Sequence, residues 1–206
     1  SAREFALAEI FMLNPGQVLT ASQRARLARA RNSDSTVVIR GIEEISDPNS
    51  RPPSASGTHT WRFPADSVRD FAWAAARHFV WDAARANGGK TLAMSFYPPS
   101  AEPVWSQSTQ YVRFAVDNYS SWYRYPYPVA INVNGIEGGM EYPMMTCIGG
   151  RRDTLALYSV TVHEIAHMWF PMQVGSDEKR YSWQDEGLTR FNQAQGMQEF
   201  FPGYDR

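Results

Sequence analysis

The feature that most constrains this fold is a pair of histidines four positions apart, His163 and His167, inside a mostly apolar stretch. Asp153 is a good helix N-cap residue and Pro171 is a natural stop, so the stretch predicts a helix from Asp153 to about Phe170. Residues four apart in a helix lie one turn above each other. Both imidazoles are therefore expected to project from the same helix face.

Two neutral imidazoles on one helix face can bind one Zn²⁺ ion, with each nitrogen at about 2.0–2.1 Å. Glu164 follows the first histidine directly and is placed to accept a proton from an attacking water as a general base. Catalytic zinc usually has three protein ligands, so a third is expected further along. Glu186, 19 positions after His167, is the candidate. Its neighbour Asp185 could instead accept a hydrogen bond from a histidine and orient it.

The alternative is that the histidine pair arises by chance, with both rings solvated or making ordinary hydrogen bonds. The capped apolar helix and the later glutamate favour the metal interpretation. One zinc ion per chain is therefore the expected cofactor.

In the rest of the chain, the spacing of apolar residues changes near the middle from a strand-like to a helix-like pattern. Expected strands before that point are residues 36–42, 58–63, 69–75, 77–82 and 91–97, with a loop at 47–57 and a turn at Asn87-Gly88-Gly89. After it come a helix over 107–124, a strand over 129–133, and a last helix from a capping-box-like start at Ser182 to about Phe200. Strands first and helices later predict the α+β class.

Charge and composition limit the kinds of partner that the sequence predicts. The net charge is −1, which gives no electrostatic case for nucleic acid. The run of arginines from Arg24 to Arg31 is expected to be a solvated helix after a possible cap at Ser22, with a docking patch as the alternative. No stretch approaches the about 20 apolar residues of a membrane span. The start has no signal-peptide pattern, and the single Cys147 selects no compartment, so the localisation stays open.

Two motifs resemble the aminopeptidase N and leukotriene hydrolase family of gluzincin metallopeptidases. That family has H-E-x-x-H, eighteen intervening residues, and a glutamate in a Trp-x-Asn/Asp-Glu-Gly context; here the same spacing leads to Trp183-Gln-Asp-Glu-Gly187. Upstream, the family has Gly-x-Met-Glu-Asn, and this chain has Gly138-Gly-Met-Glu-Tyr142. The resemblance is strongest from about Thr91 to Phe200.

The resemblance implies that Glu141 binds the free α-amino group of a peptide substrate. It also implies that the backbone of Gly138, Gly139 and Met140 pairs with that peptide. The substrates would then be peptides with a free N-terminus. Tyr142 stands where the family has asparagine, which changes the local hydrogen bonding but not the carboxylate.

The resemblance further implies two domains. Residues 1–86 would be the C-terminal part of a β-sandwich-like N-terminal domain, and residues 87–206 the zinc-bearing N-terminal part of a thermolysin-like catalytic domain. Family members have an oxyanion-stabilising tyrosine beyond the third ligand, which cannot be assigned before Arg206. We therefore expect a fragment, with self-association through apolar surface that truncation exposes.

Three functions follow from these expectations. The first is a zinc aminopeptidase that removes the N-terminal residue of peptides. The second is a gluzincin of another kind, such as an endopeptidase, which would accept N-acetylated peptides. The third is a zinc-binding chain without catalytic activity, because the oxyanion tyrosine and the helical domain are missing.

Overall fold

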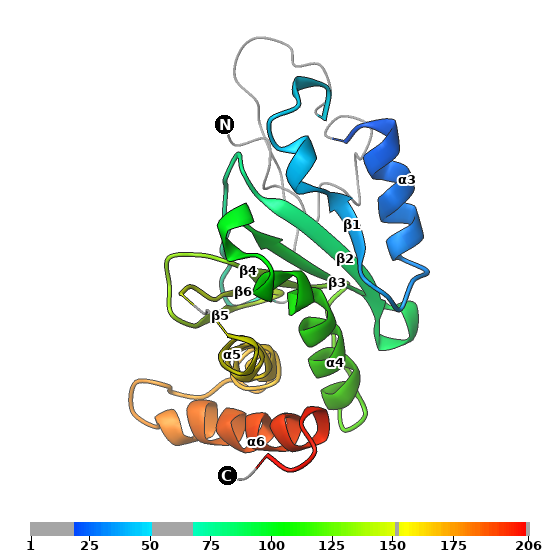
Figure 1. Cartoon of the computed structure of the whole chain (residues 1–206). Coiled ribbons are helices and arrows are strands. Elements are labelled where there is room, and N and C mark those ends of the chain that lie inside the picture. Colours follow the sequence, from blue (N-terminus) through cyan, green and yellow to red (C-terminus); the bar gives the residue numbers. More distant parts are fainter. Residues whose placement is uncertain (1–18, 51–67, 151–152, 205–206) are drawn as a thin grey trace.

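The computed structural model describes residues 19–50, 68–150 and 153–204 (Figure 1). Within them a six-stranded mixed sheet has the order β1-β2-β3-β4-β6-β5. Its strands are β1 (Val37–Arg40), β2 (Val80–Ala86), β3 (Thr91–Tyr97), β4 (Val129–Val133), β5 (Met140–Tyr142) and β6 (Met145–Cys147). The helices are α3 (Ala21–Ala30), α4 (Ser108–Ser120), α5 (Thr154–Ala166) and α6 (Leu188–Phe200). This mixed architecture is compatible with the predicted α+β class.

Helices cover both faces of the sheet, with α3 on one side and α4 and α5 on the other, and α6 packs beyond α5 (Figure 1). Strand β3 shows how the sequence serves both faces, because successive side chains point to opposite sides. Leu92, Met94 and Phe96 belong to the core beneath α3, whereas Ala93 and Tyr97 belong to the core beneath α4 and α5. Strand β3 is thus buried on both faces, as its near-continuous apolar sequence requires.

The sheet combines one long hairpin with parallel strands. β2 and β3 pair antiparallel along their whole length through the turn Asn87–Gly89, where Asn87, Gly88 and Gly89 have φ of 52°, 62° and 86°. The predicted turn is confirmed, and its glycines suit these positive φ values. β4 joins β3 and β6 in parallel, and β5 pairs antiparallel with β6 at the sheet edge. The expected division after residue 86 lies inside the β2–β3 hairpin, and it stays a prediction.

The predicted helices are present in the structure, but their bounds are shorter or shifted. Thr20, not Ser22, caps the arginine-rich helix α3, because its side chain accepts from the Gln23 backbone and Gln23 reciprocates. Helix α4 covers less of the chain than the expected 107–124. At the start of α5, Asp153 accepts a hydrogen bond from the Ala156 backbone at 2.8 Å, which confirms the predicted cap.

One expected strand is wrong and another is displaced. Residues 69–75 form no strand, and Phe71 and Trp73 are exposed at 79% and 70%. The period of two is real, but the alternate alanines at 72, 74 and 76 pack inward in place of the aromatic side chains. The strand expected at 77–82 begins at Val80 and continues to Ala86, because pairing with β3 outweighs the weak strand preference of its alanines.

Some expectations concern other parts of the chain. The strand at 58–63 and most of the loop at 47–57 lie outside the described residues. In the part of the chain that the structure describes, no helix is long and apolar enough to span a membrane. Several large apolar side chains are exposed on the α4–α6 side, namely Trp122, Tyr123, Val174, Trp183 and Phe191. The expected self-association stays a prediction.

Candidate metal centre

Helix α5 positions both candidate histidine ligands, but it ends earlier than predicted. The last α-helical residue is Ala166 and His167 is its C-cap, where the sequence predicted a helix to Phe170. Beyond Ala166 the chain tightens into turns, with hydrogen bonds from Met168 N to Ile165 O and from Trp169 N to Ala166 O. His167 keeps helical φ and ψ, so its ring still lies one turn from that of His163.

Three donor groups converge at one point. His163 Nε2 lies 3.3 Å from His167 Nε2 and 3.3 Å from Glu186 Oε2. The second carboxylate oxygen of Glu186 lies 3.9 Å from His167 Nε2. The structure therefore brings together the three residues that the sequence predicted as ligands.

These separations fit a tetrahedral ion. Two ligand atoms at about 2.0–2.1 Å from one ion, at a tetrahedral angle, stand about 3.3–3.4 Å apart. The nitrogen–nitrogen distance and the shorter nitrogen–oxygen distance are both 3.3 Å. Two imidazoles and one carboxylate are also a ligand set that catalytic zinc uses, so the residues fit the metal that the sequence predicted.

The surroundings of His167 assign its proton to the ring nitrogen that faces away from this point. Nδ1 lies 2.8 Å from the Phe170 carbonyl oxygen, 2.8 Å from Asp185 Oδ1 and 3.2 Å from Thr189 Oγ1. The Phe170 carbonyl oxygen can only accept, so Nδ1 carries the hydrogen and donates to it. Nε2 of the nearly inaccessible ring, 1% exposed, then presents a lone pair to the site.

A second chain of hydrogen bonds does the same for His163. Gln193 on α6 donates its amide nitrogen to the Ser159 carbonyl and hydroxyl oxygens, both at 2.9 Å. This fixes Gln193 Oε1 as the group that faces His163 Nδ1, at 3.2 Å. Because that oxygen can only accept, His163 is also protonated on Nδ1. Two lone pairs then face each other at 3.3 Å, an arrangement that a cation between them would stabilise.

A π-helical turn (η7, Trp183–Gly187) supplies both carboxylates. Consecutive side chains from this turn reach opposite nitrogens of the same His167 ring, Asp185 at Nδ1 and Glu186 at Nε2. The capping-box start predicted at Ser182 is wrong, because Ser182 already has helical φ and ψ and its side chain caps nothing. Short π-turns are often found at functional sites, and this one leads directly into α6.

The candidate base Glu164 is buried on α5 next to the first histidine, with 5% of its surface exposed. The loop before β5 lies directly above it. A Cβ atom at Gly139 would collide with Glu164 Oε1 and press on Val160, so no larger residue fits there without displacing the carboxylate. The glycine-containing motif thus touches the predicted base.

Glu141 lies in the middle of β5, the edge strand of the sheet, and comes close to the ligands. The nearest ligand-type atoms of Glu141, His167 and Asp185 all lie within 4.8 Å of one another. Met140 belongs to the same strand, and Gly138 and Gly139 precede it. The structure therefore brings both motifs together at one place, with an edge strand beside the candidate metal ligands.

Burial shifts the pKa values of two groups at the site, His163 and Glu141. It lowers the pKa of His163, and the neighbouring His167 lowers it further, which favours the neutral imidazole that binds metals. Burial also raises the pKa of Glu141, although His167 opposes that rise. A cation brought beside Glu141 would favour its ionised form.

Sequence reasoning named Asp185 as a partner of a histidine ring, but it missed the other groups at the two Nδ1 atoms. Gln193 and Thr189 lie seven and three positions after Glu186, so a search for polar residues on the ligand face of the next helix would have found both. The Phe170 carbonyl has no side-chain signal, because its position depends on the turn that ends α5.

No family model matches the chain, and no curated protein matches it. The family resemblance therefore rests on the two motifs.

Proposed function

We propose that this chain is a zinc-dependent aminopeptidase that hydrolyses the first peptide bond of peptides. The observation that carries the proposal is the position of His163 Nε2, 3.3 Å from His167 Nε2 and 3.3 Å from Glu186 Oε2, with both imidazole lone pairs turned inward. When bound, the ion supplies Lewis acidity, which polarises a carbonyl and acidifies water.

The chain's own residues would divide the remaining work. Glu164 would hold the proton taken from the attacking water and then donate it to the leaving amine. Glu141 would bind the substrate ammonium and set which bond is cleaved. The edge strand β5 offers backbone groups with which an extended peptide can pair. Asp185, Thr189 and Gln193 would keep the histidine rings in register.

The finer fold assignment belongs to the same proposal. We infer that residues 87–206 are the zinc-bearing part of a thermolysin-like catalytic domain and that residues 1–86 are the C-terminal part of a β-sandwich-like domain. The two motifs in the expected order support this, together with a helical pair that holds the ligands beside a mixed sheet.

The deciding experiment compares an aminoacyl amide with its N-acetylated twin on the zinc-loaded chain. The proposal expects cleavage of the free amine alone and loss of cleavage on chelation. Equal cleavage of both substrates would point to an endopeptidase-like gluzincin. One zinc ion per chain without cleavage of either would mean a metal site without catalysis.

A further inference from the structure

A row of polar side chains crosses the sheet on the face covered by α4 and α5. Strand register aligns Asp82 with Ser95, Ser95 with Asn132, Asn132 with Thr146, and Thr146 with Glu141. Side chains directly opposite each other in neighbouring strands share a face. Four members, Asp82, Ser95, Asn132 and Thr146, are no more than 1% exposed, and the row ends at Glu141 beside the metal ligands.

Asn132 is the junction of this row. Its amide nitrogen donates to Ser108 Oγ on α4 and to Thr161 Oγ1 on α5, both at 2.9 Å. Its amide oxygen accepts from Thr146 Oγ1 on β6 at 3.1 Å. One buried side chain therefore ties the central strand β4 to two helices and to a neighbouring strand.

The two threonines lead to different parts of the proposed site. Thr161 is two residues before His163 and three before Glu164, within the same helix. Thr146 is the register partner of Glu141 in the short antiparallel pair of β5 and β6. Asn132 is thus hydrogen-bonded directly to α5, which carries the proposed base, and to β6, which pairs with the strand that carries Glu141.

We propose that Asn132 is a positioning residue that sets the separation between Glu141 and the metal ligands through Thr146 and Thr161. This inference rests on the proposed function, because it gives Glu141 and the ligands a shared substrate. Asn132 does not touch that substrate. It holds α5 and the β5–β6 pair in one relative position, so that an ammonium on Glu141 and a group on the metal can belong to one molecule.

If Asn132 only stabilised the fold, removing any polar side chain of the row should have the same effect. Another residue of the row can test this. Ser95 is equally buried and also bonds to Ser108, at 2.9 Å, but no bond from its hydroxyl to α5 or β6 is present in the described structure. Ser95→Ala is therefore the matched control: it weakens the same buried row without loosening the link between the base helix and the substrate strand.

The experiment uses the whole chain loaded with Co²⁺ and follows its visible absorption. Two probes are titrated, an aminoacyl hydroxamate and its N-acetylated twin, and the ratio of their dissociation constants measures how Glu141 and the metal act together. We expect wild type and Ser95→Ala to prefer the free amine equally. In Asn132→Leu the preference should fall by about tenfold, because small misplacements weaken two-point binding strongly. Co²⁺ affinity should change less than the probe ratio.

Thr161→Val and Thr146→Val remove one hydroxyl each with little change of shape, so they keep the test available if Asn132→Leu does not fold. Both should lower the preference in the same direction. Wild-type preference in all three variants, or an equal fall in Ser95→Ala, would overturn the positioning role and leave the proposed function intact. A wild-type chain that binds Co²⁺ but prefers neither probe would overturn Glu141 as the amine site and this inference with it.

Discussion

The two faces of the sheet are built differently. The face toward α3 is apolar across the central strands, with Trp81, Met94, Phe96 and Ile131 among its buried side chains. The face toward α4 and α5 carries the polar row among its apolar neighbours. Buried polar groups must be hydrogen-bonded to be tolerated, and they fix one arrangement of the elements around them. The hydrogen bonds on the face beside the proposed site therefore restrict the arrangement of strands and helices more than the apolar contacts on the other face do.

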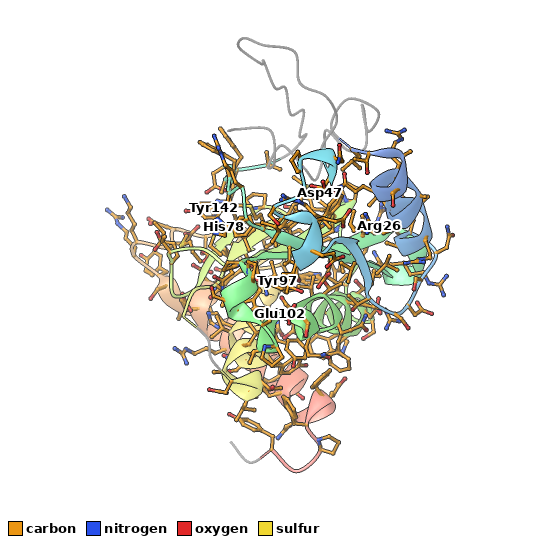
Figure 2. The ribbon with its side chains drawn as sticks, turned by 45° about the horizontal axis from the view of Figure 1, so that its top comes forward. Arg26, Asp47, His78, Tyr97, Glu102 and Tyr142 are labelled. Carbon is orange, nitrogen blue, oxygen red and sulfur yellow. The ribbon has the colours of Figure 1, made fainter. Side chains whose placement is uncertain are left out.

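The two ends of the polar row differ as well. At one end Asp82 is buried in the core, where Tyr97 Oη donates to its Oδ2 at 2.6 Å. Tyr97 Oη also lies 3.1 Å from Glu102 Oε1, and both of these side chains are labelled in Figure 2. At the other end Glu141 lies on an edge strand within reach of the ligands. Both ends of the row thus carry an acidic side chain. Asp82 is part of the buried core, whereas on the proposed function Glu141 binds the substrate.

The largest effect should come from the proposed base. Glu164→Gln keeps the size of the side chain but cannot take a proton, so turnover should fall by about 10²–10⁴-fold. Zinc stoichiometry should stay at one per chain, measured by metal analysis beside the kinetics. Unchanged turnover in this variant would remove Glu164 from the role of base.

On the apolar face the expected effect is on stability alone. Met94→Ala should lower the free energy of unfolding by about 2–5 kcal/mol, because Met94 is 1% exposed and its removal leaves a cavity. Zinc affinity of the folded chain should not change. Met94→Leu, which conserves volume, is the control for denaturant unfolding. A matching loss of zinc affinity in Met94→Ala would show that the two faces are not independent.

The buried end of the row predicts a pH dependence. Burial raises the pKa of Asp82 from 3.8 to about 7, so the folded chain retains a proton that the unfolded chain releases between these values. The stability contributed by this group is present below pH 3.8 and is lost as pH rises through about 7. Asp82→Asn cannot ionise, so its stability relative to wild type should rise over that window, by up to about 4 kcal/mol, and then level off.

Thermal unfolding from pH 4 to pH 8 measures that difference, with Glu199→Gln as the control because Glu199 is exposed on α6. A stability difference between Asp82→Asn and wild type that does not vary with pH would mean that Asp82 does not titrate in this range.

The smallest effect should come from the ring support. Gln193→Leu removes the acceptor for His163 Nδ1 and should weaken zinc binding by about 10–100-fold, the usual loss when a group behind a ligand is removed. Gln195→Leu, two positions along α6, is the control. Competition against a chromophoric chelator gives both affinities, and equal affinities would show that Gln193 does not orient the ring.

Local patterns in the sequence predicted much of this molecule. The Asp153 cap, the i,i+4 histidines and the glycine turn at 87–89 depend on neighbours within one or two turns, and the structure has all of them. The spacing of Glu186 also anticipated a group that comes close to both rings.

Features that depend on tertiary pairing were missed. Residues 69–75 have a strand-like period, yet whether an extended segment joins a sheet depends on an available edge. The polar row could not be seen either, because it exists only through the register of β2 to β6. The π-turn was missed as well, because no local pattern in 183–187 indicates it.

Because of the π-helical turn at Trp183–Gly187, the site depends on the number of residues in that turn as well as on their identity. Deleting Gly187 would leave an ordinary helix, in which each side chain before the deletion is rotated by about 100° relative to α6. Both histidines and both carboxylates could survive such a deletion, and the carboxylates would still point away from the rings. The loss of a single codon would therefore separate the candidate ligands while leaving all of these residues in the gene.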